Sequence, residues 1–200
     1  MSSALTFNTR LLLLSGAVGS GKTSVTTALL DTYRFRKVST GRHLTGLATA
    51  QGLSPERAVL QQLGDTLDVQ TDYAWPVNVA VEQMQKAAGG EALVWLLDAV
   101  RKPRQVAHFR EAFAHVLHVH LTASEEVLRA RYLQRQSAGD KREAAVSYEA
   151  LVCHPNEVAS RALGSIADVV YNSGDRSAYS IANDIVQTTQ GLQHGPSGVD

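Results

Sequence analysis

Eight consecutive residues near the start of the chain have types and a spacing that suit phosphate binding. The complete pattern G-x-x-x-x-G-K-[ST] is met by Gly16-Ala17-Val18-Gly19-Ser20-Gly21-Lys22-Thr23. Because glycines carry no Cβ atom, such a loop turns tightly and brings its amides close to an anion. The Lys22 ammonium then reaches the β- and γ-phosphates, and the Thr23 hydroxyl binds Mg²⁺. The motif therefore predicts a site for ATP and Mg²⁺.

The residues around this motif have the patterns that it requires. Leu11–Leu14 is apolar enough for a buried strand, and Ser24–Tyr33 has the composition of a helix. The loop therefore joins a strand to a helix N-terminus, which favours anions. The predicted nucleotide-binding residues of this segment are Gly16, Gly19, Ser20, Gly21, Lys22, Thr23 and Ser24.

Strand-like and helix-like segments alternate along the chain, which predicts one α/β domain with a parallel sheet between two layers of helices. The predicted strands are Leu11–Leu14, Phe35–Ser39, Ala92–Leu97, His115–Leu121 and Ala167–Tyr171. The predicted helices are Ser24–Tyr33, Gly41–Gln51, Pro55–Leu67, Tyr73–Ala88, Pro103–Ala114, the segment from Glu125 to Gln136, Glu157–Leu163 and Ser177–Gln187. Capping patterns assign two helix starts, at Ser54 with Pro55 and at a capping box over Thr122–Glu125. We expect the domain to span 1–189 and the glycine-rich segment 190–200 to be a disordered tail.

Ligands of parallel sheets bind at the carboxyl ends of the strands, and four polar segments follow predicted strands there. They are the phosphate loop, Ser39-Thr40-Gly41, Asp98 to Arg101, and Asn172 to Gly174. Asp98 follows an apolar strand, where a carboxylate can hold Mg²⁺ through water or accept a proton from an attacking hydroxyl. Ala99 stands where many ATPases place the Glu that activates water, which favours transfer to a bound acceptor over hydrolysis.

Arginines supply the charge that phosphoryl transfer needs. Arg101 can grip a phosphate of the acceptor through two parallel hydrogen bonds. Arg129, Arg131 and Arg135 lie on one predicted helix, and the last two share a face because they are four residues apart. Such side chains stabilise the charge on a transferred phosphoryl group, and a surface helix also carries arginines for solubility alone.

Composition and charge disfavour several other functions. The 200-residue chain is 44% hydrophobic and has 19 basic and 19 acidic residues without a basic stripe, so no nucleic-acid interface is expected. Leu11–Leu14 is too short to span a membrane, and no signal-peptide pattern is expected at the start. The single cysteine, Cys153, fits a reducing compartment, so we expect a cytoplasmic protein. His118 and His120 share a strand face without a carboxylate or cysteine at ligand spacing, which favours core histidines over a metal site.

Taken in order, these motifs resemble those of P-loop kinases of the nucleoside-monophosphate-kinase type, roughly over residues 10–187. The segment from Asp98 to Val106 is similar to D-G-x-R-x-P-x-E-V of dephospho-CoA-kinase-like and adenylate-kinase-like proteins. The segment from Ala167 to Gly174 is similar to their adenine-side A-D-x-x-I-x-N-x-G, and Ser39-Thr40-Gly41 resembles the S-T-G that opens the acceptor helix of adenylate kinases. The chain departs from these patterns at Thr45, where adenylate kinases have an Arg, and at Ala99, which replaces the usual Gly.

The resemblance implies a P-loop fold with a five-stranded parallel sheet, a helical acceptor cap at about 40–88 and a short lid at about 137–151. The residues that it implies for the acceptor are Ser39, Thr40, Gly41, Arg42 and Arg101. The further residues that it implies beside ATP are Arg129, Asn172 and Gly174. The implied catalytic residues are Lys22, Asp98, Arg131 and Arg135, with Thr23 and Asp98 as Mg²⁺ ligands.

The expected activity is ATP-dependent transfer of the γ-phosphate to a small phosphorylated acceptor, a (deoxy)nucleoside monophosphate or a dephospho-CoA-like molecule. Two other classes stay open: a regulatory nucleotide switch with slow ATP turnover, and an assembly protein that keeps the loop as a scaffold. A GTPase switch is disfavoured, because no strand end carries the base-reading motif N-K-x-D.

Overall fold

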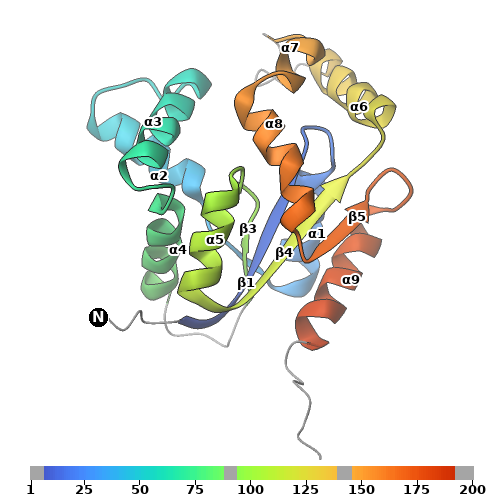
Figure 1. Cartoon of the computed structure of the whole chain (residues 1–200), viewed down its shortest axis with the longest axis horizontal. Helices are drawn as coiled ribbons and strands as arrows, with labels where there is room; N and C mark the ends of the chain where they lie inside the picture. Colours follow the sequence, from blue (N-terminus) through green and yellow to red (C-terminus); the bar gives the residue numbers. More distant parts are fainter. Residues whose placement is uncertain (1–6, 88–93, 139–145, 192–200) are drawn as a thin grey trace, which may run out of the picture.

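The structure, a computed structural model, describes residues 7–87, 94–138 and 146–191, which form a parallel sheet with helices on both faces (Figure 1). Its strands are β1 (Phe7–Gly16), β2 (Arg36–Lys37), β3 (Trp95–Leu97), β4 (Phe113–Thr122) and β5 (Val169–Asn172). Its helices are α1 (Lys22–Tyr33), α2 (Thr40–Ala50), α3 (Arg57–Gln70), α4 (Trp75–Lys86), α5 (Pro103–Ala112), α6 (Glu125–Ser137), α7 (Tyr148–Val152), α8 (Pro155–Ala162), the 3₁₀-helix η1 (Leu163–Ile166) and α9 (Ala178–Gly191). The strand order is β2-β3-β1-β4-β5, and each of these pairings is parallel.

The central strand β1 shows why both faces of the sheet are covered. Leu11 and Leu13 belong to a core cluster with residues of α4 and α5. Leu12 and Leu14 belong to a second cluster with residues of α1 and α9. Successive strand side chains point to opposite faces, so a four-leucine run that is at most 1% exposed requires helices on both sides. Each buried leucine contributes roughly 1.5–3 kcal/mol to stability. The predicted α/β/α fold with a five-stranded parallel sheet is confirmed.

Two predicted helix caps are wrong. Helix α3 begins at Arg57, so Ser54 and Pro55 precede the helix and do not cap it. Strand β4 continues to Thr122, and Ser124 rather than Thr122 is the N-cap of α6. Capping rules describe how a helix starts, and they cannot show that a neighbouring strand has already taken the residue into its ladder.

Some predicted segments are shorter, longer or outside the described residues. Strand β2 contains only Arg36–Lys37, and the part of the third predicted strand before residue 94 lies outside the described residues. Helix α9 continues to Gly191, two residues into the predicted tail, and 192–200 lie outside the described residues. Helix α7 (Tyr148–Val152) occupies a segment for which the sequence predicted no helix.

The carboxyl ends of the strands lie at one end of the sheet, as the predicted site requires. Helices α2, α3 and α4, which we call the cap helices, lie on one side of this end, and α6, α7 and α8 lie on the other (Figure 1). The phosphate loop is between them, at the top of β1 in this view. Within the described residues, no helix combines the length and the apolar character that crossing a membrane would need.

Three buried polar side chains form a hydrogen-bonded group directly before the phosphate loop. Ser15 Oγ lies 2.7 Å from His118 Nε2 and 2.9 Å from His120 Nδ1. Burial lowers the pKa of His118 to about 4, and the charge of Arg110 acts in the same direction. Burial also lowers the pKa of His120, with a smaller effect from Lys22. Both rings are therefore neutral core histidines at physiological pH, and their shared partner is a serine.

We expect the free energy of unfolding to fall as the pH drops from 6.5 towards about 4, the range between the ordinary and the lowered pKa of His118. In this range the unfolded chain binds a proton that the folded chain does not, so protonation favours unfolding. His118→Gln removes the titrating ring and should flatten the pH dependence of urea unfolding. His115→Gln, at an exposed position of the same strand, should keep the wild-type dependence. An equally steep dependence in His118→Gln would contradict the assignment.

Candidate active site

The phosphate loop joins β1 to α1 through glycines whose backbone angles other residues rarely adopt. φ is +145° at Gly16, +86° at Gly19 and +86° at Gly21. A Cβ atom at Gly16 would lie 2.4 Å from the carbonyl oxygen of Leu121, and one at Gly19 would lie 2.8 Å from that of Leu128. The loop therefore passes closer to β4 and α6 than any side chain would permit.

Lys22 is the first residue of α1, and its ammonium group bends back over the loop. Its Nζ donates to the carbonyl oxygens of Gly16 at 2.5 Å and Ala17 at 2.9 Å. Burial lowers the pKa of Lys22 to about 8, and the nearby carboxylate of Glu157 opposes this shift. Lys22 therefore remains mostly protonated at neutral pH, as a contact with phosphate requires.

Three predicted site residues, two in the loop between β3 and α5 and one on α6, lie near Lys22. Besides Glu157, the charges close enough to change the pKa of Lys22 are those of Arg101, Asp98 and Arg135. Asp98 follows β3, Arg101 lies in the loop before α5, and Arg135 lies on α6. The structure thus gathers cations and carboxylates from three segments at the end of the phosphate loop.

The start of α1 has features that fit a phosphate ligand. The side chains of Thr23 and Ser24 are exposed in the first helical turn. Ser20 Oγ is fully buried, and within the described part of the chain it has no hydrogen-bond partner. An unpaired hydroxyl in this loop, next to the free N–H groups of a helix start, suits an anion with several acceptor oxygens.

Asp98 stands beside the phosphate loop because β3 pairs directly with β1. Its Oδ2 accepts hydrogen bonds from Thr26 Oγ1 at 3.1 Å and from Lys37 Nζ at 2.6 Å. Thr26 lies one turn after Thr23 on α1, so Asp98 faces the side of the helix that carries the predicted Mg²⁺ hydroxyl. Thr23 and Asp98 therefore fit a Mg²⁺ site. Lys37, at the end of β2, is a neighbour that sequence analysis missed.

A glutamine fixes the loop that carries Arg101 to the cap helices. Gln105 Oε1 accepts from the N–H groups of Arg101 at 3.0 Å and Lys102 at 3.3 Å, and its Nε2 donates to Asp68 Oδ1 at 3.1 Å. Asp68 is 7% exposed and also accepts from Trp75 Nε1 at 2.8 Å. The exposed Arg101 guanidinium itself has no hydrogen bond or ion pair with the described residues, so it is available to an anionic ligand.

The segment Ser39-Thr40-Gly41 shapes the start of α2. Ser39 Oγ accepts from the N–H of Arg42, and the Gln83 side chain bonds both the N–H of Ser39 at 2.9 Å and its C=O at 3.2 Å. Thr40 is buried, whereas a Cβ atom added at Gly41 would meet no atom within 4 Å. Among the described residues, no partner of the exposed Arg42 guanidinium is found. Contact of these residues with the acceptor stays a prediction.

Arg131 joins the phosphate loop to the turn after β5. Its Nη1 donates to Gly19 O at 3.2 Å and to Ser173 Oγ at 3.0 Å, and its Nη2 donates to Ser173 O at 2.8 Å. Asn172 Oδ1 accepts from the N–H of Gly174 at 2.9 Å and so forms the turn. Ser173, between the two predicted residues, makes the contact and was missed. A direct role of Arg131 in the transition state stays a prediction.

Arg129 and Arg135 lie on different faces of α6. Arg135 acts on the pKa of Lys22, whereas Arg129 forms an ion pair with Glu149 of α7 at 2.6 Å. The structure therefore does not place Arg129 with the phosphate loop, contrary to expectation. The physical reason is helix geometry, because a position two residues before Arg131 is rotated by about 200° from it.

Helix α8 supplies two contacts to the phosphate loop that sequence analysis missed. Glu157 Oε1 accepts from the N–H of Val18 at 2.9 Å, and Ser160 Oγ donates to Gly16 O at 3.0 Å. Glu157 and Ser160 are 6% and 5% exposed. No pattern marks these residues, because an acid in the first turn of a helix is common for capping alone.

The predicted lid at 137–151 is only partly described. Helix α6 ends at Ser137, and 139–145, which include Lys141 and Arg142, lie outside the described residues. Beyond this gap, Tyr132 OH donates to Val146 O at 2.6 Å, which holds the start of the α7 segment against α6.

Comparison with known proteins identifies the family. The model of an AAA domain matches residues 15–149. The chain belongs to this P-loop family. No curated protein sequence matches it.

Solved structures give the same fold. A putative kinase from Chloroflexus aurantiacus has 18% identity and a TM-score of 0.56, over 92% of this chain and 97% of its own. Shikimate kinase from Acinetobacter baumannii, in complex with shikimate, has 16% identity and a TM-score of 0.54, over 94% and 96%. Shikimate kinase from Aquifex aeolicus has 15% identity and a TM-score of 0.51, over 92% and 98%. At these identities the likeness shows the fold alone.

Removal of the Arg131 side chain should loosen the phosphate loop. Arg131→Ala leaves the Gly19 carbonyl and Ser173 without their half-buried donor, so we expect a loss of about 1–3 kcal/mol in the free energy of unfolding. Arg129→Ala, which removes an exposed ion pair on the same helix, should cost under about 1 kcal/mol. Chemical denaturation of both variants measures the difference, and equal losses would contradict the role of Arg131 as a clamp.

Proposed function

We propose that this protein is an ATP-dependent phosphotransferase that moves the γ-phosphate of ATP to a small phosphorylated acceptor. A (deoxy)nucleoside monophosphate and a dephospho-CoA-like molecule are the acceptors that we favour. The observation that carries the proposal is the Arg101 guanidinium, which has no hydrogen bond or ion pair with the described residues and whose charge is close enough to lower the pKa of the phosphate-loop lysine, Lys22. A second cation at this position suits the phosphate of an acceptor.

The donor side of the reaction rests on the phosphate loop. Loop amides and the start of α1 hold the phosphates of ATP, and Lys22 and Arg135 stabilise the charge on the transferred group. Thr23 and Asp98 would hold Mg²⁺, which supplies further neutralisation when bound. The attacking oxygen of the acceptor forms a bond to the γ-phosphorus while the bond from that phosphorus to the β–γ bridging oxygen breaks, which leaves ADP.

The surroundings of Asp98 favour an acceptor that attacks through a phosphate oxygen. The Lys37 ammonium lies 2.6 Å from Asp98 Oδ2, and Thr26 bonds the same oxygen. Two donors of the protein already occupy this oxygen, so it is not open to the proton of an attacking hydroxyl. A phosphate monoester is already largely dianionic at neutral pH, with a second pKa of about 6, so it needs no base. A hydroxyl acceptor would need one.

The cap helices are the proposed acceptor domain, and the segment around 137–151 is the proposed lid. Arg101 and Arg42 would bind the acceptor's phosphate, beside the start of α2 formed by Ser39, Thr40 and Gly41. Shikimate kinases are among the proteins of similar fold, one of them in complex with shikimate, and Arg101 would also suit a carboxylate. Screens should therefore include shikimate and sugar acids with nucleotides and coenzyme A precursors.

Lys22→Ala should abolish most ATP binding and turnover. The variant lacks the charge that contacts the phosphates, so we expect ATP–Mg²⁺ affinity to fall at least about tenfold and turnover by about 100-fold or more. Lys86→Ala removes an exposed lysine that pairs with Glu82 on α4 and should behave as wild type. Calorimetry and ADP release measure both effects, and unchanged affinity and turnover in Lys22→Ala would refute the donor site.

Arg101→Ala should weaken acceptor binding and leave ATP binding nearly unchanged. We expect the KM for the acceptor to rise by about tenfold or more, while ATP affinity stays within about twofold, because a charged hydrogen bond to the acceptor is lost. Arg104→Ala is the matched control, since this neighbouring arginine pairs with Asp72 on the surface. If no acceptor in the panel raises ADP release above its basal rate, the slow nucleotide switch replaces the kinase as the best function.

A further inference from the structure

Helix α8 (Figure 1) forms hydrogen bonds both with the phosphate loop and with helix α3 of the cap. On the loop side, Glu157 accepts from the Val18 amide and Ser160 donates to the Gly16 carbonyl. Both side chains are buried, so these bonds are shielded from water and are stronger than exposed ones. The loop, which joins β1 to α1, is therefore also held by a third element, α8.

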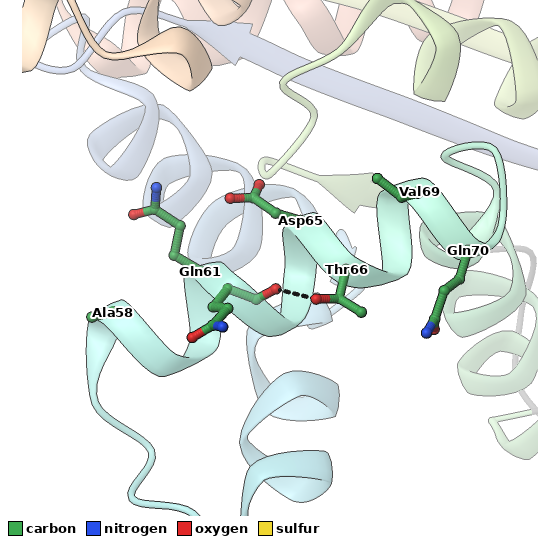
Figure 2. A pocket seen from close by; sticks show the side chains of 7 residues that line it. Ala58, Gln61, Asp65, Thr66, Val69 and Gln70 are labelled. Atoms are coloured by element: carbon green, nitrogen blue, oxygen red, sulfur yellow. Dashed lines mark hydrogen bonds between the residues drawn. The ribbon is translucent and has the colours of Figure 1, made fainter.

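On the cap side, the N-terminal end of α8 is bonded to helix α3. The side-chain amide of Gln61 lies 3.0 Å from His154 Nε2, and Asn156 Nδ2 donates to Asp65 Oδ1 at 3.3 Å. His154 is the N-cap of α8, and its Nδ1 accepts from the N–H of Asn156 at 3.2 Å. Figure 2 shows Gln61 and Asp65 on the helix that carries these contacts.

Glu157 has the properties of an anchor rather than of a surface acid. Besides the Val18 amide, Oε1 accepts from Arg161 Nε at 3.0 Å, and Arg161 in turn donates to Glu125 and to Tyr148 OH. A buried carboxylate is tolerated only when it is bonded and paired in this way. Its position is therefore fixed from α6 and α7 as well as from α8 itself.

We propose that Glu157 is a positioning residue of the phosphate loop, and that Gln61 and Asp65 of the cap hold the helix that carries it. The geometry of the donor loop then depends on the position of helix α3, which is bonded to α8. The proposal rests on the proposed function only in taking the cap as the acceptor's domain. The chain of contacts runs from Asp65 through Asn156 and α8 to Glu157 and the amide of Val18.

The first test uses neighbouring positions of α3. Gln61→Ala and Asp65→Ala each remove one bond to α8, whereas Gln62→Ala and Gln70→Ala change residues of the same helix whose side chains have no hydrogen bond to α8 within the described part of the chain. We expect the first pair to speed hydrogen exchange at the Val18 amide and to weaken ATP–Mg²⁺ binding by about threefold each, and the second pair to change neither. An equal effect of Gln70→Ala and Asp65→Ala would overturn the proposal.

The second test separates the hydrogen bond from the charge of Glu157. Glu157→Ala removes the acceptor of the Val18 N–H and should weaken ATP–Mg²⁺ binding by about tenfold. Glu157→Gln keeps a side-chain oxygen in the same place and removes a negative charge near the phosphates, so its affinity should equal or exceed that of wild type. A Gln variant as weak as the Ala variant would overturn the positioning role.

A double-mutant cycle then measures the link between the cap and the loop. If α8 transmits the effect of the cap to the loop, Asp65→Ala and Glu157→Ala together should weaken ATP–Mg²⁺ binding by clearly less than the product of their separate effects. If the double variant weakens ATP–Mg²⁺ binding by the full product of the two single effects, the proposed link between the cap and the loop is overturned. Should Glu157→Ala fail to fold, Ser160→Ala takes its place. Exchange at the Val18 amide is measured without nucleotide, so it decides the proposal even if the wild-type protein binds no ATP and the proposed function fails.

Discussion

Close approach of backbone to backbone is the constraint on which the site depends. Gly16 and Gly19 pass within contact of the Leu121 and Leu128 carbonyl oxygens, at positive φ angles that only glycine adopts without strain. This packing fixes the loop against β4 and α6 before any ligand is considered. Because β1 lies between β3 and β4, it also sets the distance from the loop to Asp98 on one side and to α6 on the other. The charged side chains around Lys22 then act on a loop whose conformation the backbone packing has already fixed.

The balance of charge around Lys22 follows from this placement. Arg101 and Arg135 bring positive charge to the same point, and Glu157 and Asp98 bring negative charge. Each carboxylate is held by protein groups, Glu157 by an amide and Arg161, and Asp98 by Thr26 and Lys37. The Arg101 guanidinium has no such partner among the described residues. An incoming polyanion therefore meets a site whose anions are already neutralised and whose cations are partly available.

The sequence predicts the parts of this protein that local pattern controls. The leucine run of β1, the glycine loop and the apolar strand before Asp98 require no knowledge of distant residues. Lys37, Ser173, Glu157 and Ser160 were missed because each acts through a contact with a segment far away in the chain, and a lysine, serine or glutamate has no distinctive local pattern. The helix cap at Thr122 was wrong because β4 continues through this residue, and the cap at Ser54 was wrong because α3 begins only at Arg57. Arg129 was misplaced because charge alone does not tell which face of a helix it occupies.

The contacts of α8 have a consequence for how the chain divides. The family-defining segment ends at residue 149, whereas Glu157 and Ser160, which hold the phosphate loop, come after it, as do β5 and the turn that Arg131 binds. A fragment that ends at residue 149 would keep every residue of the nucleotide motif but would lose Glu157 and Ser160, the buried side chains that bond the loop. Recognition of the family and integrity of the loop are thus encoded in different stretches of sequence. A change in the later stretch would therefore alter the support of a loop whose own motif is unchanged.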